Sequence, residues 1–115
     1  MRFKNNPARG GFIENIFIRN CRVKTSRFGI YITMRYASSG AKEGDAMPVV
    51  RGIDIRDCSF KTLTKQPIVI EGWSPTAPVT DVTIANCEFP SDAKANSITN
   101  AARIHLYQNR TAGTK

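Results

Sequence analysis

The chain has 115 residues and a formal net charge of +8, with 17 lysines and arginines against nine acidic residues. No apolar run is long enough to cross a membrane, so we expect no membrane-spanning segment. No stretch longer than a few residues carries helical periodicity, which argues against a helical domain.

The basic residues are concentrated near the start of the chain. Among residues 1–36, eight lysines and arginines accompany one acid, Glu14, whereas bases and acids are nearly balanced in the remainder. Such an excess predicts an anionic ligand, although any single arginine can equally be a solvated surface residue. The basic residues of this part are Arg2, Lys4, Arg9, Arg19, Arg22, Lys24, Arg27 and Arg35.

One motif occurs three times along the chain. Its copies are residues 13–23 (IENIFIRNCRV), 50–60 (VRGIDIRDCSF) and 79–89 (VTDVTIANCEF). Each has two apolar residues in alternation, then a cysteine that follows Asn or Asp. Recurrence at intervals of a few tens of residues predicts a solenoid, whose repeats bury their cores against one another.

The spacing inside the motif indicates strands. Ile16 and Ile18 are two residues apart, which puts them on one face of a strand, but Cys21 follows after three. A bend at Asn20 returns the cysteine to the interior, and Asn or Asp tolerates left-handed backbone geometry there. A strand, a tight bend and another strand, repeated at equal height, predict a parallel β-helix.

Further apolar strands lie between the copies, at residues 28–36, 67–73 and 98–107, and loops rich in Gly, Ser, Pro and Ala follow at 37–48 and 74–79. We therefore expect an all-β chain, a single-stranded solenoid of roughly three to three and a half coils.

Residues 1–109 form the predicted solenoid domain, and residues 110–115 a polar tail. No capping helix or polar first coil precedes Phe3 and Phe12, so we expect that amino-terminal coils are missing and that the open coil self-associates. No signal sequence is visible.

Cys21, Cys58 and Cys87 occupy the same place in successive repeats. We expect a core ladder of free thiols, with a disulfide between adjacent coils as the alternative. Their spacing matches no zinc pattern, and we expect no metal and no cofactor. The residues that precede the cysteines, Asn20, Asp57 and Asn86, should form a second ladder whose side chains bond backbone groups at the bends.

The start of the chain carries the segments Arg2-Phe3-Lys4 and Arg9-Gly10-Gly11, followed by residues 12–18 and, further on, residues 28–36. The first of these are similar to the Arg-Ile-Lys region of glycoside hydrolase family 28, the polygalacturonases, and residues 28–36 resemble the segment after it. The resemblance spans about residues 2–109. It implies a right-handed parallel β-helix, inverting hydrolysis of α-1,4-galacturonan in pectin, a role in cell-wall degradation, and a secreted or periplasmic location.

By the same resemblance, Arg2, Lys4 and Tyr36 bind substrate. Arg2 and Lys4 would hold the uronate carboxylate, one as a two-donor fork and the other as a point charge, while Tyr36 contacts sugar. Residues two apart face the same side of a strand, so Phe3 should point into the core. Frayed terminal residues and a surface aromatic at a strand end are the alternatives.

The family's catalytic segments, Asn-Thr-Asp, Asp-Asp and Gly-His-Gly, do not occur in this sequence. Inverting hydrolysis needs a general acid and a general base, and Asp45, Asp54, Asp81 and Asp92 lie outside any matching context. His105, the single histidine, should be a core or surface residue. We therefore predict no catalytic residue and no activity for this chain alone.

The expected partner is an anionic polysaccharide, polygalacturonate or pectin, rather than nucleic acid or a membrane. A different class of function stays open: a non-catalytic β-solenoid that binds an anionic polysaccharide or packs into a larger assembly.

Overall fold

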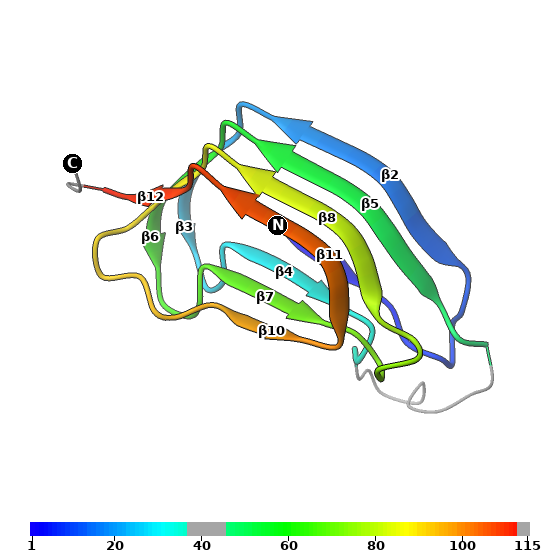
Figure 1. The fold of residues 1–115 in the computed structure, drawn as a ribbon. Helices are drawn as coiled ribbons and strands as arrows, with labels where there is room; N and C mark the ends of the chain where they lie inside the picture. Colours follow the sequence, from blue (N-terminus) through cyan, green and yellow to red (C-terminus); the bar gives the residue numbers. More distant parts are fainter. Residues whose placement is uncertain (37–45, 113–115) are drawn as a thin grey trace.

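A computed structural model describes residues 1–36 and 46–112, in which twelve strands and no helix occur (Figure 1). Most of the predicted loop at 37–48 lies outside the described residues. The strands are β1 (Arg2–Lys4), β2 (Phe12–Arg19), β3 (Arg22–Ser26), β4 (Ile30–Thr33), β5 (Val49–Arg56), β6 (Ser59–Leu63), β7 (Ile68–Glu71), β8 (Val79–Ala85), β9 (Glu88–Phe89), β10 (Ser97–Thr99), β11 (Ala101–Tyr107) and β12 (Arg110–Thr111).

The strands form three parallel sheets. Sheet A has the order β1-β4-β7-β10, sheet B the order β2-β5-β8-β11, and sheet C the order β3-β6-β9-β12. Consecutive strands along the chain belong to different sheets, so each coil contributes one strand to each sheet (Figure 1). This arrangement confirms the all-β solenoid of the parallel β-helix type.

Each sheet has four strands, so the described chain makes four coils where we predicted three to three and a half. The additional coil comes from residues 97–111. The predicted single strand at 98–107 is wrong, because Asn100 adopts a positive φ of 50° and divides it into β10 and β11. Moreover, Arg110 and Thr111 pair with β9 as β12 instead of beginning a polar tail.

The core lies between the sheets and is built from the inward residues of the middle coils. Ile30 and Ile32 of sheet A, Ile53 and Ile55 of sheet B, and Phe60 of sheet C are almost fully buried. In the end coils, the equivalent residues are only partly buried, because one side of each end coil is not covered by another described coil. These residues are Phe3, Ile13, Ile16, Ile18, Val23, Ala101, Ile104 and Leu106.

The bend between sheets B and C has the predicted left-handed backbone. Asn20, Asp57 and Asn86 have φ values of 57°, 58° and 52°, and Gln108 at 56° takes the same place in the last coil. A second left-handed position, which we did not predict, recurs in the middle of the sheet B strands, at Asn15, Gly52, Asp81 and Arg103.

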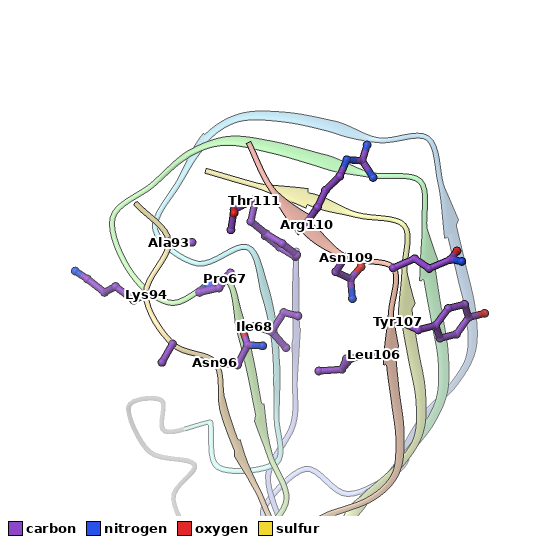
Figure 2. Close-up of a pocket in the computed structure, with 13 residues that line it drawn as sticks. Pro67, Ile68, Ala93, Lys94, Asn96, Leu106, Tyr107, Asn109, Arg110 and Thr111 are labelled. Carbon is purple, nitrogen blue, oxygen red and sulfur yellow. The ribbon is translucent and has the colours of Figure 1, made fainter. Parts of the chain in front are cut away.

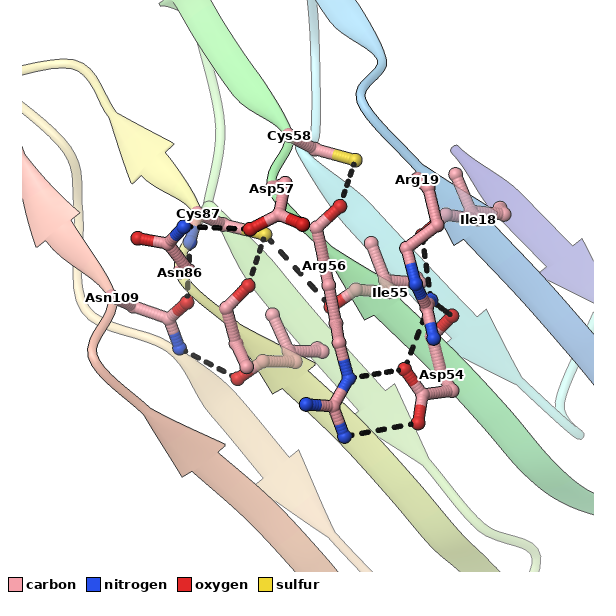
Figure 3. Close-up of polar contacts among 12 residues, drawn as sticks. Ile18, Arg19, Asp54, Ile55, Arg56, Asp57, Cys58, Asn86, Cys87 and Asn109 are labelled. Carbon is pink, nitrogen blue, oxygen red and sulfur yellow. Dashed lines mark hydrogen bonds and ion pairs between the residues drawn. The ribbon is translucent and has the colours of Figure 1, made fainter.

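Two of the three predicted side chains at this corner, those of Asp57 and Asn86, form part of the expected ladder, although by a different route (Figure 3). Asn86 Nδ2 donates to Asp57 Oδ1 at 2.6 Å, and Arg110 Nη1 donates to Asn86 Oδ1 at 2.9 Å. These side chains therefore bond one another, whereas we expected bonds to the backbone. The backbone amides of Asn20 and Asp57 instead donate to carbonyls of the next coil.

The three cysteines are free, and two of them form the expected core ladder. Cys58 and Cys87 are buried, and burial raises the pKa of both thiols. Cys21 is exposed, so its predicted place in the core is wrong: among the described residues, no strand covers the first coil on its outer side. In the last coil Asn109 takes the cysteine position, and its amide accepts a hydrogen bond from Cys87 N and donates one to Ile84 O, both at 2.9 Å.

Candidate functional site

The outward face of sheet A brings the predicted site residues together. Parallel pairing sets Arg2 beside Tyr31 and Lys4 beside Thr33. Arg2 and Lys4 are exposed and the side chain of Phe3 between them packs against the core, as the alternation of a strand requires. We call this surface, with Tyr36 at its margin, the sheet A face.

Tyr36 lies directly under two cationic side chains. Lys4 Nζ is 4.3 Å from the centroid of the Tyr36 ring, and Arg9 Cζ is 5.6 Å from it. The backbone of Tyr36 is held in place because its amide donates to Asn5 O at 3.1 Å and its carbonyl accepts from Asn6 Nδ2 at 2.7 Å. Lys4 therefore lies over a ring whose backbone is held in place by hydrogen bonds.

Tyr31 is a second ring on this face, and sequence analysis missed it. Arg2 Cζ is 5.2 Å from its centroid, Phe28 meets it edge-on at 4.6 Å, and its hydroxyl donates to Glu71 Oε1 at 2.9 Å. Burial, and then the hydrogen bond to Glu71, raises the pKa of Tyr31. The hydroxyl therefore stays protonated and the ring is fixed on three sides. The outward position of Tyr31 in residues 28–36 was the available signal.

Arg35 and Trp73 extend the face toward the next coil. Arg35 Cζ is 4.8 Å from the Trp73 ring, and its guanidinium donates to the carbonyls of Gly72 and Trp73. Trp73 is partly buried and packs against the core, so it covers a coil edge while its ring carries the arginine.

Two shallow hollows lie on the sheet A face. One, of about 130 Å³, is lined by Arg2, Tyr31, Thr33, Arg35 and Tyr36. The other, of about 170 Å³, is lined by Met1, Arg2, Ser26, Arg27, Phe28 and Tyr31. Arg2 and Tyr31 belong to both, so the hollows are neighbours.

The cations of this face differ in their partners from the arginines of sheet B. Within residues 1–36 and 46–112, Arg2, Lys4, Arg27 and Arg35 form no ion pair with an acid and lie over aromatic rings instead. Cations paired with acids lose much of their attraction for an external anion, whereas these four keep theirs.

Sheet B shows the opposite arrangement. Arg51 bonds Glu14 at 2.9 Å and Arg103 bonds Asp81 at 2.6 Å, while Asp54 lies between two arginines (Figure 3). Asp54 Oδ1 is 2.8 Å from Arg56 Nε and 3.0 Å from Arg19 Nη1. Hydrogen bonds from Arg56 and from Arg103 lower the pKa of Asp54 and of Asp81 respectively. The four arginines of sheet B are thus all paired with its three carboxylates.

The basic first third is therefore not one cluster. Arg2 and Lys4 lie on sheet A, Arg19 lies on sheet B, and Arg22 and Lys24 are exposed on sheet C. The sequence showed the excess of charge but not its division among three faces.

Three carboxylates of the described chain are poorly suited to act as a general acid. An inverting hydrolase needs a carboxyl whose pKa is raised, whereas the pKa values of Asp54 and Asp81 are lowered and Glu71 accepts the Tyr31 hydroxyl. His105 is an exposed residue of β11. Asp45 lies outside the described residues.

The described residues contain neither a metal-binding cluster nor a membrane-spanning helix. No group of three or more His, Cys, Asp or Glu side chains is placed to hold a metal ion. No helix there is long and apolar enough to cross a membrane.

A larger hollow, of about 560 Å³, opens at the carboxyl-terminal end of the solenoid (Figure 2). Ile68, Leu106 and Asn109 point into it, whereas Lys94 and Tyr107 point away. Ile68 and Leu106 belong to the core of the last two coils, and Asn109 bonds the backbone of the coil beneath it. The hollow is therefore the uncovered end of the core rather than a cleft on a sheet.

The chain is 30% identical over 100 residues to a probable polygalacturonase from Vitis vinifera. The match covers 85% of this chain and 20% of the relative, so the chain spans about a fifth of the length of the curated protein it matches. No protein-family model matches the chain. This similarity supports a polygalacturonase-like relationship. The three parallel sheets agree with the parallel β-helix that the family resemblance implies.

Proposed function

We propose that the sheet A face binds a polyuronate of the pectin type, as part of a polygalacturonase-like substrate cleft. One observation carries the proposal: Arg2 and Lys4 lie over aromatic rings and have no acidic partner among the described residues, and Arg2 borders a hollow. The relationship to a probable polygalacturonase names the ligand class.

Each of the three predicted residues has a role that suits a uronate. The guanidinium of Arg2 offers two parallel donors to a carboxylate, and Lys4 adds a compact charge. Tyr36 offers a ring for the apolar side of the sugar and a hydroxyl for a polar contact. Lys4 is already 4.3 Å from the Tyr36 ring, so carboxylate and sugar would be bound side by side.

Hydrolysis of α-1,4-galacturonan with inversion is proposed for a longer protein that contains this chain, and no hydrolase activity for the chain alone. The support is the state of its carboxylates, since Asp54 and Asp81 are held ionised by arginines and so are poorly suited to donate a proton. The relationship also suggests a secreted or periplasmic setting.

The test uses the full chain and polygalacturonate in a titration calorimeter. We expect Lys4→Gln to weaken binding about tenfold, because a charge-assisted contact is lost. Lys61→Gln is the matched control, since Lys61 is an exposed lysine of β6 on sheet C and should leave the affinity unchanged.

The same mixtures are assayed for reducing ends. We expect no release above a heat-treated control. Equal weakening by both lysine variants would contradict the proposed face, and turnover by the unmodified chain would contradict the proposed lack of activity.

The alternative function is a non-catalytic solenoid that takes any anionic polysaccharide. The concentration of unpaired cations on one face favours it, because such a face also attracts polymers of other geometry. Binding of dextran sulfate as tight as that of polygalacturonate, at equal salt, would favour this alternative.

A further inference from the structure

The two hollows of the sheet A face are similar in their chemistry. Each combines an arginine of its own with the shared Arg2 and Tyr31: Arg35 in the hollow beside Tyr36, and Arg27 in the hollow beside Phe28. Each also holds a second aromatic ring and a hydroxyl-bearing residue, Thr33 or Ser26. A repeated set of an arginine, a ring and a hydroxyl suits a repeated ligand unit.

The Phe28 hollow has a cation that is available for a ligand. Arg27 is exposed and its Cζ lies 5.9 Å from the Phe28 ring centroid. Within the described chain it forms no ion pair with an acid. Arg27 lies in the connection between β3 and β4, at the start of the sheet A strand, whereas Arg35 and Tyr36 follow its end. The two hollows therefore follow one another along β4.

Tyr31 is a rigid boundary between them. Its hydroxyl is bonded to Glu71, its edge meets Phe28, and Arg2 covers its ring. Because the Tyr31 side chain is already fixed, no conformational entropy is lost at this residue when a ligand binds. The two hollows therefore keep their separation.

We infer that Arg27, with the shared Arg2 and Tyr31, forms a second carboxylate subsite, so that the sheet A face takes two successive uronate units of one chain. This inference rests on the proposed function. It adds a length requirement: a dimer engages both hollows and gains from linkage of the two contacts, whereas a monomer engages one.

Calorimetric titration of the full chain with galacturonic acid and with digalacturonate tests this subsite. We expect digalacturonate to bind more tightly than the monomer, and Arg27→Gln to lower the dimer affinity about tenfold while the monomer affinity stays within about twofold. Arg22→Gln is the matched control, because Arg22 is an exposed arginine of the adjacent strand β3 on sheet C. It should change neither affinity.

Arg27→Lys keeps the charge but removes the two-donor fork, so we expect an intermediate dimer affinity. An equal loss of dimer affinity in the Arg27→Gln and Arg22→Gln variants would overturn the subsite, since it would report net charge alone. Equal affinities of monomer and dimer for the unmodified chain would overturn the subsite and leave the proposed function standing. Absence of binding by both ligands would overturn the two together.

Discussion

Cys21 and its two equivalents differ in what the neighbouring coil does to each thiol. Burial raises the pKa of Cys58 and of Cys87, so these thiols stay protonated and inaccessible, whereas Cys21 is exposed. In the folded chain at pH 8 we expect one thiol to react quickly with a chromogenic disulfide reagent. The other two should react only after addition of denaturant.

Cys21→Ser serves as the control for this thiol count, because it should remove the fast reaction and leave the two slow thiols. Three fast thiols in the native chain would contradict the buried ladder. Reaction of fewer than three in denaturant without reductant would indicate a disulfide.

Arg2, Lys4 and Tyr36 were predictable from the sequence because they belong to a family motif and to strands of regular period. Tyr31 and Arg35 were missed because their contacts with Glu71 and Trp73 join different coils. Such contacts depend on the register between coils, which the spacing of a single repeat does not reveal. For the same reason the exposure of Cys21 was not foreseen.

Among the elements, the end of β7 lies very close to the following turns, and it can do so because Gly72 has no side chain. A Cβ on Gly72 would lie 1.9 Å from Asn100 O and 2.9 Å from Pro78 Cα, both backbone atoms. We expect Gly72→Ala to lower the free energy of unfolding by at least about 2 kcal/mol, because the backbone of two coils must move. Urea denaturation followed by circular dichroism measures the change.

Gly11→Ala is the comparison for this glycine. Gly11 has a positive φ of 73° and open space around its missing Cβ, so its cost is backbone strain alone, about 1 kcal/mol. A loss for Gly72→Ala no larger than that for Gly11→Ala would contradict the close approach.

The elements themselves were predictable where hydrophobic alternation was strong. The strands of the three motif copies correspond to β2 with β3, β5 with β6, and β8 with β9. The fourth copy escaped notice because Asn109 stands where the others have cysteine, and because Ala101 and Ala102 weaken its apolar pattern. The left-handed position in the middle of the sheet B strands was hidden because Asn, Gly, Asp and Arg share no composition signal.

At the scale of the whole molecule, the amino-terminal end of the solenoid is open. β1, β2 and β3 are edge strands, and the inward side chains of their coil, such as Ile18, are only partly buried. Open strand edges pair readily with other chains. We expect the average mass in sedimentation velocity to rise above 12.8 kDa as concentration increases.

Two lysine variants distinguish association through the open end of the solenoid from association through the outward face of sheet B. Ile18→Lys places a charge on the open end and should suppress association. Phe17→Lys is the control, because Phe17 is 69% exposed on the outward face of sheet B and lies next to Ile18 in β2. Suppression by Phe17→Lys alone would indicate contact through sheet B, and a constant mass of 12.8 kDa would contradict association.

The exchange of cysteine for Asn109 in the last coil has a consequence for oxidation chemistry. The two ends of the solenoid are not equivalent, since one carries the exposed sulfur of Cys21 and the other an amide bonded to the coil beneath it. In air, a covalent dimer of the native fold would therefore form through Cys21, joining two molecules head to head. The opposite end of the solenoid has no exposed thiol, so peroxide, glutathione and other thiol reagents would not react there.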